Sequence, residues 1–562
     1  MRCLIILLRY NRPTGIFAPQ TDKGDYNYNI PVGLAYISAF LKKSGHEIQF
    51  LNLNHIDGIV EEIIKDRLSK ESFDFVITGG ISPFYPEVRS CVESARKYSP
   101  NTRIIVGGGL ISSQPEIMFN LLQPDYGVIG EGELTIKELF ECLENKGDIN
   151  TVHGLIFRDS EGHIIVTKPR DSIDDLDSLP WPDYDGLGFD EYLEHMLPGH
   201  VYYYSIFDNP RVYPVIASRS CPFACTFCFH PLGKKFRKRS IENIMAELEY
   251  AVKRYKINII GFYDELFAND KQRVYDFSTS LTKFLKTVPW EVKWHCQMRV
   301  DHLDEEMITL LENSGCYFLS LGLESYSSPV LESMNKKITP AQIDNAIRLC
   351  ACHNMAITGN FICGDPAETI ETYREAIKYL KENEDILKNQ VSMGLINLFQ
   401  GAPIYKRALE KGIIKDEIAF INERAAKGIL PLNFTDKMTD EEFQLMQEDI
   451  DDAMLVSRRY SEPLLDKEIN GVREVHIKCP YCKNISVYRN VDLSPDILPV
   501  LLSCRKCNAR IIIPSEKMRI NILIYRILGS KNGRTFIWHA SRLKGRLKSL
   551  KQRIFNLLLK KE

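Results

Sequence analysis

The sequence predicts an α/β protein with two successive parallel sheets and a small cysteine-containing β module near the C-terminus. Apolar, strand-like runs alternate with helical segments over residues 1–145, and the same alternation returns over residues 210–405. Strands separated by helices connect through right-handed crossovers, so both regions should form parallel sheets. We expect a doubly wound, Rossmann-like sheet in the first region and a partial (β/α)6 TIM-type barrel in the second.

The composition is that of a soluble globular chain. Of 562 residues, 44% are hydrophobic and 26% charged, and the net charge of -3 gives no whole-chain attraction to nucleic acid or membranes. The apolar run 4–8 is too short to span a membrane and lacks a signal-peptide cleavage site, so it should be a buried strand. The 15 cysteines are odd in number and unevenly clustered, which favours a reducing, cytoplasmic location and metal ligation over disulfides.

The first region divides into elements at glycine-rich turns. Expected strands are residues 3–8, 46–53, 73–80 and 102–109, with a further segment at 126–133, and expected helices are 32–45, 88–98 and 135–147. Residues 146–165 should form a hairpin, because two apolar runs flank the turn residues Ser-Glu-Gly. A linker rich in Asp, Pro and Gly completes the segment 146–209.

The second region contains six strand candidates, at 212–218, 257–264, 291–299, 317–325, 356–364 and 390–399. Amphipathic helices such as 241–255 lie between them, and residues 406–470 read as a helical extension. In barrels of this kind the reactive residues gather at the C-terminal ends of the strands.

The strongest motif directly follows the first of these strands. Cys221, Cys225 and Cys228 have the spacing Cys-x3-Cys-x2-Cys. Iron–sulfur clusters are held by thiolates, and three cysteines on one loop can ligate three irons of a [4Fe–4S] cubane, which leaves the fourth for another ligand. The alternatives are three core cysteines or a zinc site with a distant fourth ligand.

This motif, with Phe227 before the last cysteine, resembles the signature of the radical S-adenosylmethionine (SAM) superfamily. The resemblance implies that SAM chelates the free iron and is cleaved to a 5′-deoxyadenosyl radical, for which an electron donor such as flavodoxin or ferredoxin is needed. It also implies SAM contacts after the later strands. These are Asp264 and Glu265 near the methionine amine, Gln297 and Arg299 after the third strand, Glu324 on the ribose, Gly359 and Gly364 beside adenine, and the sixth-strand segment 401–405. The turn at Asp264 also fits a simple helix N-cap.

The first region resembles the cobalamin-binding domain that precedes many such barrels. Glycines at strand C-terminal ends, which let a ligand approach the backbone, carry the resemblance. The residues are Gly33, Gly79, Gly80, Ser82, Gly107, Gly108, Gly109, Gly130, Glu131, Gly132 and Glu133. A sheet without ligand and a nucleotide site are the alternatives. The loop 9–20 lacks the axial-histidine pattern of some cobalamin proteins, so cobalt should have no protein histidine; His55 is expected to be a surface residue.

A second cysteine group predicts a zinc ribbon. Cys479, Cys482, Cys504 and Cys507 form two Cys-x2-Cys pairs within residues 474–514, flanked by strand candidates at 472–477, 485–491 and 509–514. Four thiolates suit tetrahedral Zn²⁺. A second iron–sulfur centre and a metal-free module are the alternatives.

The tail, residues 515–562, contains 13 Lys or Arg against two Glu, with leucines near helical spacing beyond residue 542. Such a segment suits peripheral contact with an anionic membrane or another polyanion. A solvated helix packed on the body is the simpler interpretation, and nucleic-acid binding is not expected.

Together these motifs predict a cobalamin-dependent radical SAM enzyme that methylates an unactivated carbon of a small molecule or biosynthetic intermediate. Oxidative ring formation, as in the anaerobic magnesium-protoporphyrin monomethyl ester cyclase, and radical rearrangement are alternatives. A non-catalytic cobalamin- or redox-sensing protein is the alternative from another class. The motifs concern cofactors, so they do not choose the substrate.

Overall fold

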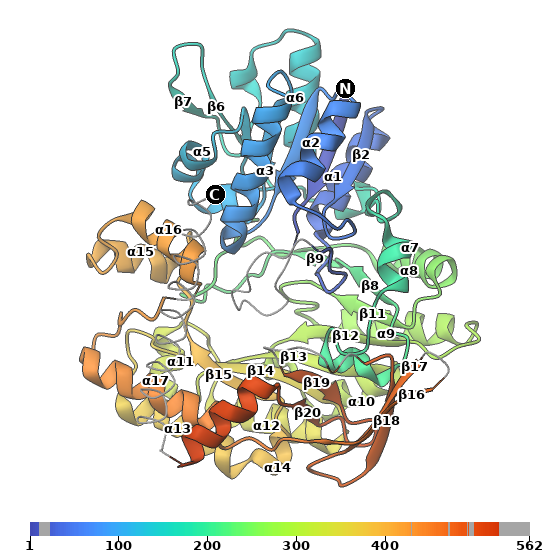
Figure 1. Cartoon of the computed structure of the whole chain (residues 1–562), viewed down its shortest axis with the longest axis vertical. Helices are drawn as coiled ribbons and strands as arrows, with labels where there is room; N and C mark the ends of the chain where they lie inside the picture. The colour runs from blue at the N-terminus through green and yellow to red at the C-terminus, as the bar shows by residue number, and fades with distance from the viewer. Residues whose placement is uncertain (10–22, 429, 470–471, 492, 494–498, 528–562) are drawn as a thin grey trace, which may run out of the picture.

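The computed structural model describes residues 1–9, 23–428, 430–469, 472–491, 493 and 499–527 (Figure 1). The predicted loop after the first strand and most of the basic tail therefore lie outside the described residues. The described part consists of two parallel sheets, one from each half of the chain, and a C-terminal β module.

The first sheet has seven strands in the order β2-β1-β3-β4-β5-β6-β7. β1 to β5 pair in parallel, which confirms the predicted doubly wound arrangement, while β6 and β7 add antiparallel at one edge. The predicted hairpin thus completes this sheet. The strands are β1 (Arg2–Leu7), β2 (Glu47–Asn52), β3 (Phe75–Gly79), β4 (Arg103–Gly107), β5 (Tyr126–Val128), β6 (Leu155–Arg158) and β7 (Ile164–Val166).

Helices cover this sheet. Central strands such as β1 and β3 are almost wholly buried, as expected for a parallel sheet with both faces covered. α2 and α5 were missed from the sequence; in α2 only Ile64 and Leu68 are buried among charged residues, so its apolar periodicity is weak. The helices are α1 (Val32–Lys43), α2 (Val60–Lys70), α3 (Tyr85–Tyr98), α4 (Gly109–Ser113), α5 (Pro115–Leu122) and α6 (Gly132–Glu144).

The second sheet has six strands, all parallel, in the order β15-β14-β13-β12-β11-β8. All six predicted strands are confirmed; closure into a partial barrel stays a prediction. The strands are β8 (Val212–Val215), β11 (Ile259–Phe262), β12 (Lys293–Met298), β13 (Cys316–Glu324), β14 (Ala356–Cys363) and β15 (Val391–Leu395). The intervening helices are α8 (Ile241–Tyr255), α9 (Lys271–Leu285), α10 (Glu305–Asn313), α11 (Ser328–Ser333), α12 (Pro340–Cys352), α13 (Ile370–Glu382) and α14 (Glu384–Leu387).

The linker runs between the two sheets. It contains α7 (Phe189–Glu194) and a tyrosine-rich turn at Tyr202–Ile206, where the Tyr203 ring stacks on Phe318 of β13 with centroids 3.9 Å apart. His55, expected at the surface, is instead buried, with its side chain 6% exposed. Its Nε2 lies 2.9 Å from the Tyr28 hydroxyl, and its Nδ1 lies 3.4 Å from a carboxylate oxygen of Glu191 in this linker. Burial lowers the pKa of His55, against the opposing effect of the Glu191 carboxylate.

The C-terminal third begins with the predicted helices, α15 (Pro403–Glu410), α16 (Glu417–Lys427) and α17 (Asp440–Leu455). The β module follows and comprises β16 (Pro463–Ile469), β17 (Val472–Lys478), β18 (Ile485–Arg489), β19 (Val500–Ser503) and β20 (Arg510–Ile513). β16 lies within residues 406–470, which were predicted to be helical, and is a strand because it pairs antiparallel with β17. Arg510 attaches this module to the second sheet by donating to the Gln390 carbonyl and the Thr358 hydroxyl, each at 3.1 Å. Among the described residues, no helix combines the length and apolar character needed to cross a membrane.

Candidate functional site: two adjoining cavities between the sheets

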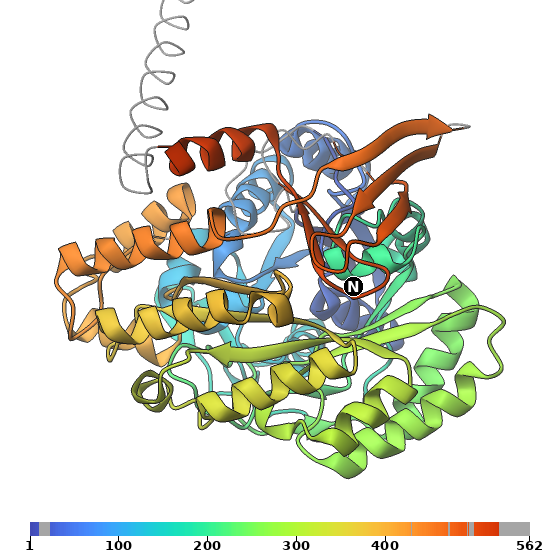
Figure 2. The same cartoon turned by 90° about the horizontal axis from the view of Figure 1, so that it is seen from below.

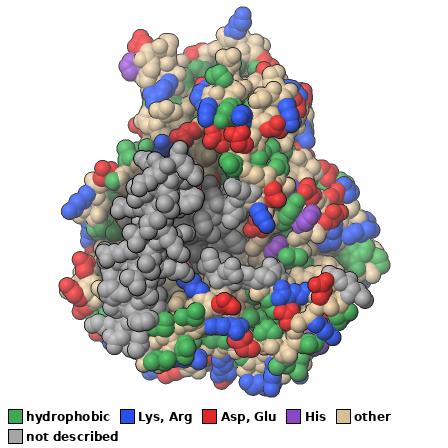
Figure 3. All heavy atoms as spheres, in the orientation of Figure 1, with side chains coloured by type: hydrophobic (Ala, Val, Ile, Leu, Met, Phe, Trp, Pro, Cys, Tyr) green, Lys and Arg blue, Asp and Glu red, His purple; other side chains and the backbone are tan. Residues whose placement is uncertain are grey.

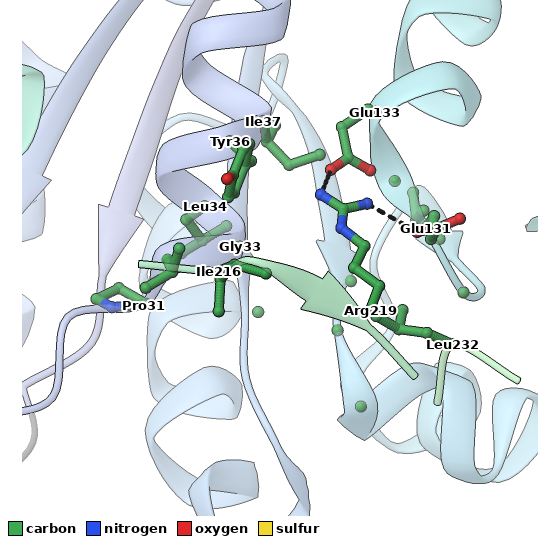
Figure 4. A pocket seen from close by; sticks show the side chains of 18 of the residues that line it. Pro31, Gly33, Leu34, Tyr36, Ile37, Glu131, Glu133, Ile216, Arg219 and Leu232 are labelled. Atoms are coloured by element: carbon green, nitrogen blue, oxygen red, sulfur yellow. Dashed lines mark hydrogen bonds and ion pairs between the residues drawn. The ribbon is translucent and has the colours of Figure 1, made fainter. Parts of the chain in front are cut away.

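The carboxyl ends of β3, β4 and β5 open into a cavity of about 400 Å³, here called the sheet cavity. Glycine-rich turns after β3, β4 and β5 line it, together with the first turns of α1 and residues 216–220 of the second half. Figure 4 shows Pro31, Gly33, Leu34, Tyr36 and Ile37 along one wall. The walls are mainly apolar. The predicted residues that line it are Gly33, Gly79, Gly80, Gly107, Gly108, Gly109, Gly130, Glu131, Gly132 and Glu133.

Packing explains some of these glycines but not all. A Cβ on Gly79 would lie 2.5 Å from the Gly107 carbonyl, and one on Gly108 would lie 2.7 Å from that of Gly80, so these glycines let adjacent backbones approach. In contrast, a Cβ on Gly33 would meet no atom of the described part of the chain within 4 Å. The open space in front of Gly33 has the character of a cradle for a large flat ligand, which fits cobalamin.

A buried ion-pair cluster closes one end of the sheet cavity. The Arg219 guanidinium donates to Glu131 at 2.7 Å and to Glu133 at 2.6 Å (Figure 4). Arg237 also binds Glu131 at 2.7 Å. Both carboxylates are therefore engaged by arginines of β9 (Ser218–Arg219) and β10 (Arg237–Lys238). We call these four residues the inter-sheet clamp, because they join the two halves of the chain.

The second cavity, here called the cysteine cavity, has a volume of about 700 Å³. Cys221, Cys225 and Cys228 all line it, as does Phe227. The cysteines are free thiols, and hydrogen bonding to Cys228 lowers the pKa of the Cys225 thiol to about 6. Three thiols on one wall of a cavity with open space beside them are the donor set that a [4Fe–4S] cluster requires.

The two cavities adjoin. Five residues line both of them, three from the turn after β11 and two from the first sheet: Ile81, Gly109, Tyr263, Asp264 and Glu265. The predicted Ser82 lines only the cysteine cavity. Groups held in the two cavities would thus face one another across this shared wall.

Asp264 lies at the junction but is held by neighbours. Its side chain is buried and its Oδ1 accepts from both the backbone N–H and the hydroxyl of Ser218, the latter at 2.7 Å. Its second oxygen is buried and has no hydrogen-bond partner among the described residues. Burial raises the pKa of Asp264 to about 7 against these hydrogen bonds. Glu265 is exposed toward the cavity, with one oxygen 3.5 Å from Nδ1 of His230.

The far wall of the cysteine cavity contains Arg299, Glu324 and Lys336. Glu324 has a left-handed φ of 61° at a pairing irregularity between β13 and β14, and it accepts from Lys336 at 2.7 Å. Arg299 binds Asp301 at 2.9 Å, and its guanidinium lies 3.7 Å from the Phe223 ring centroid. Glu324 thus combines a left-handed backbone conformation, unfavourable for a residue with a Cβ, with a carboxylate at the cavity wall.

Gly359 and Gly364 lie outside the residues that line the two cavities. A Cβ on Gly359 would meet the Leu323 side chain at 2.5 Å, and Gly364 has a φ of 99°. Local packing and backbone conformation thus explain why these two positions are glycine. Asn360 and Ile362 of β14 do line the cysteine cavity.

Sequence reasoning missed Arg219, Arg237, Lys336 and His230. Arg219 lies two residues before Cys221, so its position beside the motif was the available signal. No sequence pattern indicated Lys336 or Arg237, because the residues they bind are distant in the sequence.

The four C-terminal cysteines come together in the β module. One sulfur atom from each of Cys479, Cys482, Cys504 and Cys507 lies within 4.8 Å of the others. The sulfurs of Cys479 and Cys507 are 3.8 Å apart and those of Cys482 and Cys504 3.6 Å apart, too far for disulfides. This is a tetrathiolate arrangement suited to a tetrahedral metal.

Each half of the chain matches a known protein family. Residues 215–380 match the Radical SAM superfamily, and residues 26–140 match the B12 binding domain. An uncharacterized methyltransferase of Pyrococcus horikoshii is 30% identical over 360 residues, which cover 63% of this chain and 73% of that protein.

Two further similarities are informative. The anaerobic magnesium-protoporphyrin IX monomethyl ester cyclase of Rubrivivax gelatinosus is 25% identical over 361 residues, covering 63% of this chain and 62% of the cyclase. The structure of the radical SAM methyltransferase TsrM from Kitasatospora setae, with tryptophan and a SAM analogue bound, superposes with a TM-score of 0.59 at 17% identity. It covers 74% of this chain and 76% of TsrM, which establishes a shared fold.

Proposed function

Because the chain belongs to the cobalamin-binding radical SAM methyltransferase family, we propose that its two adjoining cavities form one active site that methylates an unactivated carbon. The chain is thus an enzyme that uses a [4Fe–4S] cluster, SAM and cobalamin. The wall shared between the glycine-lined cavity and the cysteine cavity is the observation that carries the proposal, because cofactors held in these cavities would lie side by side.

Different residues would hold the cluster and the corrin. Cys221, Cys225 and Cys228 would hold the cluster as thiolates, and the space before Gly33 would receive the corrin. When bound, the cluster and SAM supply a carbon radical and cobalamin supplies the methyl group. The chain itself would orient these groups and keep the apolar sheet cavity free of bulk water.

The polar residues of the cysteine cavity would position SAM. Asp264 is already held by Ser218, so we assign the methionine amine to Glu265 and give Asp264 the role of fixing the turn. Glu324 would bind the ribose hydroxyls while Lys336 balances its charge, and Arg299 would lie near the carboxylate. Gly359 would keep β13 close to β14, and Gly364 would allow the turn after β14.

The methylation proposal has a direct test. Anaerobically reconstituted protein given SAM and a reductant should form both 5′-deoxyadenosine and S-adenosylhomocysteine. Two products are expected because one SAM initiates the radical and another remethylates cobalt. Formation of 5′-deoxyadenosine without S-adenosylhomocysteine in the presence of substrate would instead favour oxidative cyclisation, the activity named for the Rubrivivax gelatinosus relative.

The β module would hold a structural Zn²⁺ in its four cysteines, as a ribbon docked on the beginning of β14 and β15. The tetrathiolate geometry supports zinc, and the contacts of Arg510 support a structural role. For the domains we propose 1–145, 146–209, 210–405, 406–470, 474–514 and 515–562, except that the pairing of β16 with β17 favours counting residues 463–473 with the β module. The pairing of β6 with β5 favours counting the hairpin with the first domain.

A further inference from the structure

A third cavity, of about 400 Å³, lies beside the cysteine loop but apart from the cysteine cavity. We call it the loop cavity. Thr226 lines it, whereas the neighbouring Cys225 and Phe227 line the cysteine cavity. The rest of its wall comes from the end of α11, the turn after β14, the start of α15 and the segment before α17. The loop that would hold the cluster therefore separates two different cavities.

Hydrogen bonds hold the elements of the loop cavity together. The backbone N–H of Thr226 donates to the Met334 carbonyl at 3.0 Å, and the Thr226 carbonyl accepts from the N–H of Ile404 at 2.9 Å. The N–H of Asp436 donates to the Pro366 carbonyl at 2.8 Å, which joins the segment before α17 to the turn after β14. Figure 2 shows the orange helices of the C-terminal third beside the yellow helices of the second sheet. The cavity wall is thus fixed before any ligand arrives.

Three residues of this wall contain a buried polar atom that has no hydrogen-bond partner among the described residues. These atoms are Oγ1 of Thr226, Oδ2 of Asp365 and Nε of Arg407. Asp365 is fully buried, and only its Oδ1 is engaged, by the backbone N–H of Ala367 at 2.9 Å. Arg407 uses a terminal nitrogen to bind Asp436. Buried polar atoms are nearly always hydrogen-bonded, so this set indicates a ligand that offers both a donor and an acceptor.

The charges of the wall select among such ligands. Two acidic and two basic residues line the cavity, so a simple anion would lie against Asp365 and a simple cation against Arg407. Basic and acidic side chains are also interspersed on the described surface in Figure 3, and no field of one sign would draw in either kind of ion. A zwitterion matches both charges. The remaining wall is partly apolar, with Pro366, Ala367, Pro403 and Ile404.

We propose that the loop cavity binds a free α-amino acid with an apolar side chain, and that its ligand is L-methionine. The ammonium group donates to Asp365, the carboxylate accepts from Nε of Arg407, and the thioether lies on the apolar part of the wall. The choice of methionine rests on the proposed function. Adding one electron to the sulfonium of SAM breaks its bond to C5′ and releases methionine beside the same loop.

Calorimetric titration of the full chain tests the site. The protein is reconstituted anaerobically and saturated with SAM without reductant, so that SAM fills the cysteine cavity and is not cleaved. L-methionine should then bind at one saturable site per chain. L-methioninol lacks the carboxylate and N-acetyl-L-methionine lacks the ammonium group. Each should bind roughly tenfold more weakly or worse, because one charge-assisted hydrogen bond is lost.

Two variants remove one charge or donor each while keeping the local fold. Asp365→Asn keeps an oxygen for the N–H of Ala367 but loses the negative charge, and Arg407→Lys keeps a cation for Asp436 but lacks the Nε–H. Each should weaken methionine binding by roughly tenfold or more. The matched control is Lys411→Met, which removes the other cation on Asp436 from outside the cavity and should bind methionine normally. Circular dichroism should show that all variants are folded.

Several results would overturn this site: no saturable methionine binding, equal binding by the two variants and the control, or equal binding of methioninol and N-acetylmethionine. Formation of 5′-deoxyadenosine by the same preparation, measured after adding reductant, separates this proposal from the proposed function. Normal cleavage of SAM without methionine binding would overturn the loop-cavity site alone. Methionine binding without cleavage would support the amino-acid site and count against the proposed function.

Discussion

Asp264 is a buried carboxyl group at the candidate site, and its surroundings change its pKa. Its pKa is raised to about 7 by burial, against an ordinary value of about 3.9. Between these two values the folded chain keeps the proton while the unfolded chain has lost it. The unfolded chain therefore binds fewer protons, and stability falls as pH rises through this range.

We expect Asp264→Asn to remove this dependence. The amide oxygen can still accept from Ser218, while no charge develops in the buried site at high pH. The variant should gain roughly 2–4 kcal/mol of stability relative to the unmodified chain between pH 5 and pH 8. Urea unfolding at a series of pH values measures this. Asp66→Asn, at an exposed carboxylate, is the control, and an unchanged pH slope in Asp264→Asn would refute the assignment.

Gly33 offers a second test at the level of a single residue. Because its Cβ position is open, Gly33→Leu should fold normally and gain helix propensity within α1, yet fill the sheet cavity. Cobalamin retained after desalting should fall by roughly tenfold or more, as expected when a side chain occupies ligand volume. Gly33→Ala should have a smaller effect. Full retention in the leucine variant would mean that the corrin binds elsewhere.

At the scale of elements, the inter-sheet clamp holds β9 and β10 against the turn after β5. Arg219→Met leaves Glu133 buried without its cation, which should cost about 3–5 kcal/mol. Thermal unfolding measures the loss, and limited proteolysis should show cleavage in the linker 172–209. Arg89→Met removes an exposed i,i+4 pair and should cost at most about 1 kcal/mol. Equal melting temperatures for the two variants would show that the clamp does not join the sheets.

The β module gives a prediction for its metal. Cys479→Ser should lower the zinc content from about one ion per chain to near zero, because three thiolates hold Zn²⁺ far more weakly than four. Cys352→Ser, at an exposed cysteine outside both groups, should leave zinc unchanged. Metal analysis of the two purified variants decides the question. Zinc retained by Cys479→Ser would exclude this ligand set.

At the scale of the whole molecule, the sequence allowed the prediction of both parallel sheets. The strands are short apolar runs bounded by glycine turns. Such patterns are local in the sequence, so they indicate strands without knowledge of the tertiary structure. The cysteine loop and the glycines around the sheet cavity were also predictable, because each motif is contiguous in sequence. The β module was predicted from its cysteine spacing and flanking β-branched runs.

Contacts between distant residues were not predictable. Glu131 and Glu133 were expected to contact cofactor, yet their carboxylates bind Arg219 and Arg237, more than 80 residues away. The contact between Lys336 and Glu324 was not predictable for the same reason. Ion pairs between separate elements depend on the tertiary arrangement, and no periodicity in a single sequence encodes them.

The central claim is that the two adjoining cavities form one site. Electron paramagnetic resonance of the reconstituted, reduced protein tests this directly. If cluster and cobalamin occupy the adjoining cavities, the paramagnetic cluster should accelerate spin relaxation of Co(II), and Cys225→Ser should abolish this effect while retaining cobalamin. A Co(II) signal with the same relaxation in both proteins, at full cluster and cobalamin loading of the unmodified chain, would contradict the account.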